Sequence, residues 1–250
     1  MAGVQTCALP IFLAARERSH DGDIYLYDLT VWDEAGRILE EWQGLRLRAL
    51  RRHGPPEIEA LAGPYLQRRL PEDIGVAVEP EGHDERAEAS RRVLSRAVGA
   101  DVIVRHRPDG RPEIELQVGS GNGPAISVSH GPGFVLAVAG RGPLGCDAEA
   151  AVDRPWPQLL TAGRITLAEL AAAELDEPLA VAATRVWAAT ECQVKAGGSA
   201  ADPLSLVGSP EPGWLTFASG QARVVTFATT MRGAQHPVVF AVLTGNEGRA

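Results

Sequence analysis

The fold is decided by the stretch ISVSHGPGFVLAVAGRGPLGCDAE, which runs from Ile126 to Glu149. Two turns rich in Gly and Pro divide it into short apolar segments, a pattern typical of antiparallel strands joined by tight connections. We predict strands at residues 126–129 and 134–139, and an extended segment that carries Asp147 and Glu149 after the second turn. An antiparallel sheet is therefore the centre of this part of the chain.

Helical patterns surround this stretch. Residues 84–98 place Ala89, Val93 and Leu94 on one face and arginines on the other, which predicts an amphipathic helix with a basic polar face. Further helices are expected at residues 166–175 and 178–196, and further strands at residues 101–105, 114–118, 214–218, 222–229 and 238–243. Runs of strands followed by helices predict an α+β domain.

The N-terminal part has a different pattern. Residues 24–32 and 37–50 alternate apolar and polar side chains around the turn Asp33-Glu-Ala-Gly36, which predicts a β-hairpin. A hairpin alone is marginal in water, so it belongs to a larger sheet or packs against the residues that come after it in the chain. The pattern DEAGRILEEWQGLRLR resembles the last strands of polyketide-synthase dehydratase domains, which have a hot-dog fold, and the resemblance covers about residues 23–52. Any exposed hairpin is the alternative.

These patterns give a domain plan. Residues 1–11 resemble a translated sequencing-adapter sequence and are treated as a non-native leader. Residues 12–52 are expected to be the C-terminal hairpin fragment of a dehydratase. Residues 53–82, rich in Pro and Gly around a short helix at 58–70, are interpreted as a linker. A boundary near residue 75 then leads into the α+β domain at residues 83–245.

Composition excludes several classes of function. The 250 residues are 45% hydrophobic, enough to bury a core, and the net charge of −8 disfavours binding to nucleic acid or to anionic membranes. Three cysteines without paired spacing argue against a disulfide framework or a zinc site. No apolar run approaches the ~20 residues of a membrane-spanning helix. We expect a cytoplasmic protein with no membrane or nucleic-acid partner.

Two carboxylates fall on one face of the predicted strand at its end. Asp147 and Glu149 are two residues apart, so strand periodicity points both the same way. Like charges so close cost free energy unless a cation lies between them, and a hard divalent ion such as Mg²⁺ prefers oxygen ligands. The alternative is that one acid caps the next segment and the other is solvated.

A second group of candidate residues lies on the helix predicted for residues 178–196. Four-residue spacing stacks Trp187, Glu191 and Lys195 along one face. Lys195 is the single lysine beside 23 arginines, which indicates a position where a compact ammonium matters. An ordinary helical Glu–Lys pair is the alternative.

Ser129 and His130 end the strand predicted at 126–129 and can donate hydrogen bonds to a phosphate, or simply satisfy the backbone of the turn. Arg111, in the turn Asp109-Gly-Arg-Pro112, suits forked phosphate contact if it faces a ligand. A serine hydrolase using Ser127 or Ser129 with His130 is disfavoured, because neighbouring residues on a strand point to opposite faces and no G-x-S-x-G elbow is present.

Four motifs in order, GRP, ISVSHG, GCDAE and WAATECQVKAGG, resemble those of the surfactin-type 4′-phosphopantetheinyl transferases over residues 84–243. The resemblance implies two pseudo-symmetric α+β halves with coenzyme A in the cleft between them. It implies the activity of a holo-[acyl-carrier-protein] synthase, which moves the phosphopantetheine arm of coenzyme A to a serine of an acyl carrier protein. It also suggests the C-terminal domain of an enediyne-type polyketide synthase that follows a dehydratase.

The resemblance implies a role for each matched residue. Asp147, Glu149 and Glu191 would hold Mg²⁺, with Glu191 and Lys195 as the catalytic pair. Coenzyme A would contact Arg86, Arg111, Ser129, His130 and Lys195. The departures are Thr190 in place of a lysine, Ser127 in place of an asparagine and Ala148 in place of a larger apolar residue. Because they remove one phosphate cation, a catalytically impaired coenzyme A-binding or docking module of a polyketide synthase is the alternative function.

Overall fold

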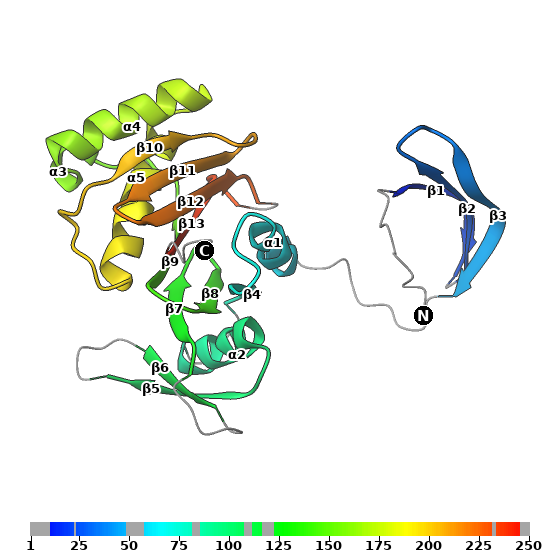
Figure 1. The fold of residues 1–250 in the computed structure, drawn as a ribbon, viewed down its shortest axis with the longest axis horizontal. Helices are drawn as coiled ribbons and strands as arrows, with labels where there is room; N and C mark the ends of the chain where they lie inside the picture. Colours follow the sequence, from blue (N-terminus) through cyan, green and yellow to red (C-terminus); the bar gives the residue numbers. More distant parts are fainter. Residues whose placement is uncertain are drawn as a thin grey trace, which may run out of the picture. The chain divides into compact units, whose positions relative to one another are not determined.

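The computed structural model describes residues 11–22, 24–48, 58–81, 86–107, 112–116, 123–231 and 234–245. The chain divides into two compact units, Met1–Pro55 and Pro56–Ala250 (Figure 1). Each unit has its own sheet structure and is described by itself. Among the described residues, no helix is both long and apolar enough to span a membrane.

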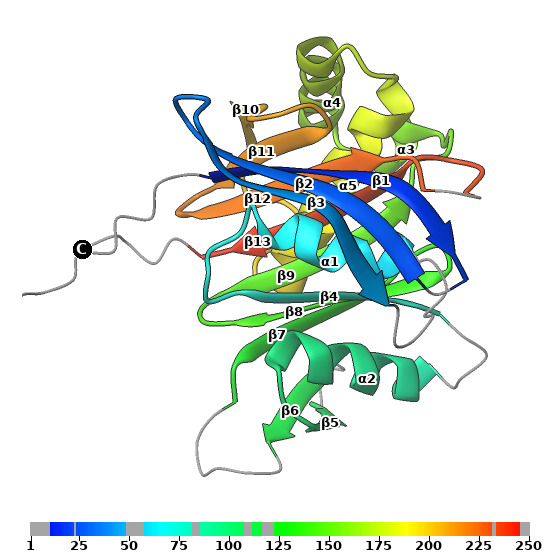
Figure 2. The same ribbon diagram turned by 90° about the vertical axis from the view of Figure 1, so that its right-hand side faces the viewer.

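The N-terminal unit is an antiparallel sheet of β1 (Ile11–Asp21), β2 (Ile24–Asp33) and β3 (Ile38–Arg48), in that order (Figure 2). The predicted hairpin is present as β2 and β3, and the carboxylate of Asp33 closes its turn by accepting hydrogen bonds from the backbone and side chain of Arg37. The strand β1 was not predicted, because its second half is polar and hides the alternation that marks a strand. The unit is thus a sheet with one strand more than expected.

The second unit contains the predicted helices and strands, with additions. Its helices are α1 (Ile58–Gln67), α2 (Arg86–Val98), α3 (Trp156–Leu159), α4 (Ala162–Leu175) and α5 (Leu179–Lys195). Its strands are β4 (Gly75–Pro80), β5 (Val102–His106), β6 (Pro112–Leu116), β7 (Ala125–His130), β8 (Phe134–Gly140), β9 (Leu144–Ala150), β10 (Ser205–Gly208), β11 (Trp214–Ser219), β12 (Ala222–Thr229) and β13 (Val238–Thr244). The predicted α+β class is confirmed.

Two antiparallel sheets pack face to face in this unit. One has the order β4-β8-β7 and the other β10-β11-β12-β13-β9, and the hairpin of β5 and β6 lies beside α2 (Figures 1 and 2). Phe134 and Leu136 of β8 meet Phe240 and Val242 of β13 in the core between the sheets. Helix α2 covers the outer face of the first sheet, while α3, α4 and α5 cover the outer face of the second. Every residue of β8 and of β13 is buried, because both faces of these strands are covered.

The two sheets share one order of elements. In the first, β4 is followed by α2, and the chain returns through β7 to β8, which pairs antiparallel with β4. In the second, β9 is followed by α3, α4 and α5, and the chain returns through β12 to β13, which pairs antiparallel with β9. The unit therefore consists of two halves of similar topology, and the second half has additional helices against its sheet.

The expected linker and domain boundary differ from the structure. Residues 58–67 form α1 and residues 75–80 form β4, so most of the region expected as a linker at 53–82 belongs to the second unit. The two compact units divide at Pro55 and Pro56, before the expected boundary near 75 and the expected start at 83. The Gly and Pro residues near β4 made this stretch resemble a linker, and its pairing partner β8 lies about sixty residues later in the chain.

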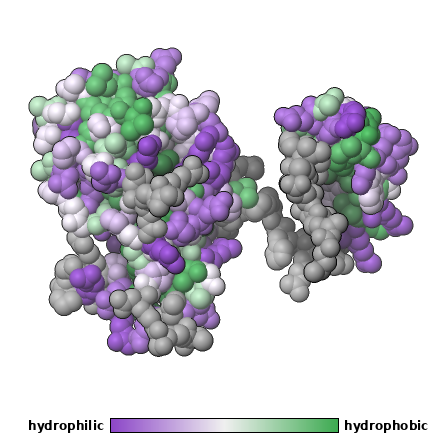
Figure 3. Space-filling model, viewed as in Figure 1, coloured by the Kyte–Doolittle hydropathy of each residue, from purple (hydrophilic) through white to green (hydrophobic). Residues whose placement is uncertain are grey.

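Exposed apolar side chains gather in one region of the second unit. The space-filling view shows hydrophobic residues over the end that carries α3 and α4 (Figure 3), where Leu159 and Leu170 are exposed. The described candidate site residues belong to other elements, chiefly β7 and β9 and the helices α2 and α5.

Candidate functional site

Asp147 is the centre of a polar cluster on β9. The ammonium of Lys195, at the end of α5, donates to Asp147 Oδ1 at 2.8 Å and to the carbonyl oxygen of Cys146 at 2.9 Å. The hydroxyl of Ser129, on β7, donates to the same Oδ1 at 2.8 Å. The side chain of Asp147 is 6% exposed and that of Lys195 is 30% exposed, so the pair is partly shielded from water. Three elements distant in sequence therefore meet at one carboxylate.

A glycine sets the distance between β9 and α5. A Cβ added at Gly145 would lie 2.2 Å from the carbonyl oxygen of Cys192, so only glycine permits this approach of the helix backbone. Gly145 and Asp147 lie on the same face of the strand. The close contact thus brings the end of α5, with Glu191 and Lys195, over the carboxylate of Asp147.

Glu191 carries an unfavourable charge in this environment. Burial raises the pKa of its carboxyl group, and the negative charges of Asp147 and Glu149 raise it further, while Lys195 opposes them. For Lys195, burial lowers the pKa of the ammonium, but the charge and hydrogen bond of Asp147 together with the neighbouring Cys146 and Cys192 outweigh burial, and the net pKa is raised. The three acids are therefore close enough to act on one another, and Lys195 stays charged at neutral pH.

Glu149 has a partner of its own. Arg154, on the segment after β9, donates from Nη2 to Glu149 Oε2 at 3.0 Å. The guanidinium carbon of Arg154 also lies 5.7 Å from the centre of the Trp156 ring. This arginine was not among the predicted site residues, because a single Arg beyond a motif carries no distinguishing signal in the sequence.

Asp147, Glu149 and Glu191 do not form a complete metal site in the structure. Within the part of the chain that the structure describes, no three His, Cys, Asp or Glu side chains are grouped closely enough to hold a metal ion. Asp147 Oδ2 is nevertheless buried without a hydrogen-bond partner, and an unsatisfied carboxylate oxygen is the kind of ligand atom that a hard divalent cation takes. The carboxylates of Asp147 and Glu191 are of the donor type that such a cation takes, while Glu149 is paired with Arg154.

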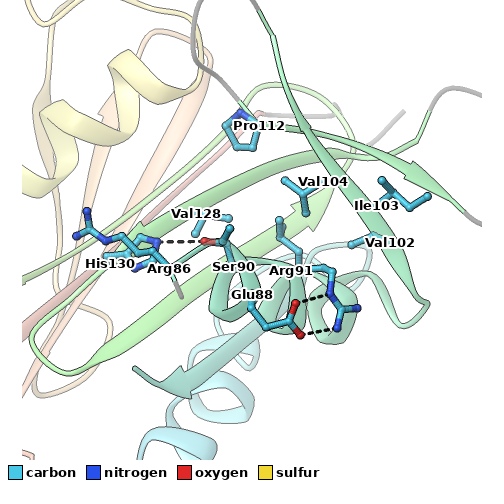
Figure 4. Close-up of a pocket in the computed structure, with 12 residues that line it drawn as sticks. Arg86, Glu88, Ser90, Arg91, Val102, Ile103, Val104, Pro112, Val128 and His130 are labelled. Carbon is cyan, nitrogen blue, oxygen red and sulfur yellow. Dashed lines mark hydrogen bonds and ion pairs between the residues drawn. The ribbon is translucent and has the colours of Figure 1, made fainter. Parts of the chain in front are cut away.

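His130 lies on the other side of β7 from Ser129. Its Nδ1 is 2.9 Å from Glu81 Oε1, and its Nε2 is 3.1 Å from the hydroxyl of Ser90 on α2 (Figure 4). Arg86 approaches the same oxygen of Glu81 at 3.8 Å. His130 and Arg86, two of the predicted anion ligands, are thus neighbours around one carboxylate.

These residues line a pocket of about 800 Å³ between α2, the β5–β6 hairpin and β7 (Figure 4). Its polar wall includes Arg86, Ser90, Arg91 and His130, and its apolar wall is made by Leu94, Val102, Ile103, Val104, Pro112 and Val128. A pocket of this volume with a few polar groups is of the size that takes a small-molecule ligand. Arg111, also a predicted ligand, lies outside the described residues, directly before Pro112.

The structure separates the serines from the histidine. Ser127 accepts a hydrogen bond from the backbone N–H of Cys146 at 3.0 Å, and Ser129 accepts one from Ala148 at 3.3 Å. Both hydroxyls thereby satisfy the free edge of β9. Neither contacts His130, so the hydrolase with Ser127 or Ser129 has no nucleophile–base pair. The serine that does reach His130 is Ser90, which only the packing of α2 against β7 brings there.

Comparison with known proteins gives one match. Residues 5–57 match the family model described as the polyketide synthase dehydratase N-terminal domain. The match includes the sheet of the N-terminal unit and confirms the dehydratase resemblance, but the matching model is of the N-terminal domain, whereas residues 12–52 were expected to be a C-terminal fragment. No curated protein matches the chain. The N-terminal part is therefore related to polyketide synthases.

Proposed function

We propose that the second unit transfers the 4′-phosphopantetheine group of coenzyme A to a serine of an acyl carrier protein, with Mg²⁺. The observation that carries the proposal is the convergence of Asp147, Glu191 and Lys195 at the contact of β9 with α5. Acids with an unsatisfied carboxylate oxygen beside a buried ammonium suit a diphosphate that is bound together with a divalent cation.

The proposed reaction needs a base and charge stabilisation. The carrier serine oxygen bonds to the β-phosphorus of coenzyme A, the bond from that phosphorus to the bridging oxygen breaks, and 3′,5′-bisphosphoadenosine leaves. Glu191, whose pKa is raised by burial and by Asp147 and Glu149, takes the proton of the serine hydroxyl directly or through water. Lys195 stabilises the charge that develops on the diphosphate oxygens. Bound Mg²⁺ would act as a Lewis acid on the same oxygens.

The pocket beside α2 suits the nucleotide end of the same ligand. Arg86 and His130 supply basic groups for a phosphate, whereas Arg91 donates two hydrogen bonds to Glu88 of the same pocket wall. The apolar wall from Val102 to Val104 offers a surface for a flat base. Two adjacent residues of β7 connect the acid cluster with the pocket. Ser129 contacts Asp147 of the cluster, while His130 faces the pocket. One extended ligand that crosses the end of β7 would contact both.

Two further observations support the proposal. The similar topology of the two halves agrees with the pseudo-symmetric α+β fold that the transferase resemblance implies. The dehydratase match of residues 5–57 agrees with a polyketide-synthase context, in which an acyl carrier protein is the expected partner.

Loading of a carrier protein tests the proposal. The protein is incubated with Mg²⁺, coenzyme A and apo carrier proteins, and the mass of each carrier is measured. We expect a mass gain of one phosphopantetheine group with the parent and none with Asp147→Ala. Asp73→Ala, which removes an exposed acid from the loop before β4, is the matched control and should load at the parent rate. Equal loading by Asp147→Ala would show that the acid assignment is wrong.

A non-catalytic coenzyme A-binding or docking module is the second candidate. The observation that favours it is Thr190, whose hydroxyl donates to the carbonyl oxygen of Val186 at 2.7 Å and so brings no charge to the acids. Calorimetry that detects coenzyme A binding while no carrier gains mass would favour this candidate over the transferase.

A further inference from the structure

We propose that Arg154 is a diphosphate-binding residue of the site and supplies the positive charge that position 190 lacks. This inference rests on the proposed function and identifies a ligand contact outside the matched motifs. In the structure Arg154 forms an ion pair with Glu149, so its guanidinium already lies at the edge of the acid cluster.

The setting of Arg154 differs from that of a solvated surface arginine. Its side chain is 30% exposed, and its guanidinium lies over the ring of Trp156, which is 3% exposed and belongs to the core beneath α4 and α5. An aromatic face holds a planar guanidinium by cation–π attraction and restricts its orientation. Arg154 is therefore held close to the acids before any ligand binds, which lowers the entropic cost of a later contact.

The charges of the cluster explain what Arg154 would do. Each acid of β9 is matched by one cation, Asp147 by Lys195 and Glu149 by Arg154. The charge of Glu191 is then in excess, in agreement with its raised pKa. A divalent cation and a doubly charged diphosphate add no net charge to the cluster. A bound cation would lie against the carboxylates while Lys195 and Arg154 turn to the phosphate oxygens, so both phosphate charges would have a cationic partner.

Geometry favours Arg154 over other positions for this role. Thr190 precedes Glu191 on α5, and its hydroxyl points back along the helix to Val186. Arg154 reaches Glu149 from the segment that follows β9. A forked guanidinium can hold two phosphate oxygens in a planar bidentate geometry, whereas the ammonium of Lys195 acts as a compact point charge.

Calorimetric titration in the presence of Mg²⁺ tests the inference without relying on turnover. The probes are coenzyme A and adenosine 3′,5′-bisphosphate, which keeps the 3′-phosphate but lacks the diphosphate. We expect Arg154→Ala to weaken coenzyme A binding by about tenfold or more, as for a lost charge-assisted hydrogen bond, and to leave the bisphosphate affinity unchanged. Adding Thr190→Lys to Arg154→Ala should recover most of the affinity.

The matched control is Arg68→Ala, which removes an arginine of 45% exposure from its ion pair with Glu211 and should change neither affinity. Unchanged coenzyme A binding by Arg154→Ala would overturn the inference while the proposed function stands. Equal weakening of both probes would also overturn it, because it would indicate a purely structural role. If the parent binds no coenzyme A, the proposed function and this inference fall together.

Discussion

Lys195 Nζ lies 2.8 Å from Asp147 Oδ1, and this contact joins the last turn of α5 to the middle of β9. The carboxylate of Asp147 is almost fully buried, so the ammonium of Lys195 is needed to stabilise its negative charge. Removing the ammonium alone should therefore cost more than removing both charges together.

We predict that Lys195→Ala lowers the free energy of unfolding by about 2–3 kcal/mol, because it leaves a buried charge without its ion-pair partner. The double variant Lys195→Ala with Asp147→Asn should be more stable than Lys195→Ala, since no unpaired charge remains. Urea unfolding at neutral pH measures the free energies of unfolding of the double variant and of both single variants, Lys195→Ala and Asp147→Asn. A double variant whose loss is the sum of the single losses would contradict a direct coupling.

Glu191→Gln should stabilise the metal-free protein at neutral pH. The folded-state pKa of Glu191 is raised, so the ionised form destabilises the fold as pH rises through that pKa, and the penalty is absent below the ordinary value of 4.5. Because Glu191 is only half-buried, solvent screening should keep the gain in Tm near 1–3 °C. Thermal unfolding from pH 4 to pH 8 should show that the difference in Tm between Glu191→Gln and the parent grows as the pH rises. A difference that stays constant would argue against the charge cluster.

Gly145→Ala should destabilise the fold and weaken the site. The added methyl would collide with the backbone of Cys192, and forcing β9 and α5 apart is expected to cost about 2–3 kcal/mol. Coenzyme A affinity should fall as well, because Lys195 moves away from Asp147. Gly163→Ala is the control, since nothing lies within 4 Å of a Cβ built there on α4. It should stabilise the protein by about 0.5–1 kcal/mol, so a similar result for both variants would refute the close approach.

The start of the second unit can be tested by truncation. Tyr65 of α1 packs on Trp214 and Phe227 at ring distances of 5.6 and 4.8 Å, and Arg68 and Arg69, directly after α1, pair with Glu211. Strand β4 covers one edge of β8. We predict that residues 56–250 unfold cooperatively on heating, whereas residues 83–250 aggregate or lack a sharp transition. Circular dichroism during heating measures this, and equal melting curves would support the later boundary.

Local sequence patterns predicted most elements of the second unit. The alternation in 222–229 and the apolar runs in 134–139 and 238–243 gave strands within a residue or two of β12, β8 and β13, because such patterns reflect short-range geometry. The patterns missed the short elements β10 and α3 and the longer strands β1 and β4. Strand β1 is masked by charged residues, and β4 lies in a stretch rich in Gly and Pro, so both are recognisable only through the strands that they pair with.

For the candidate site too, some relations between residues follow from local sequence patterns and others only from packing. The sequence by itself determined that Asp147 and Glu149 share one face of a strand and that Glu191 and Lys195 share one face of a helix, since backbone periodicity alone fixes these relations. Only the tertiary structure decided that Ser129 bonds to Asp147, that His130 pairs with Ser90 and Glu81, and that Arg154 holds Glu149. Most of these contacts join elements that only packing brings together, and no local pattern encodes them.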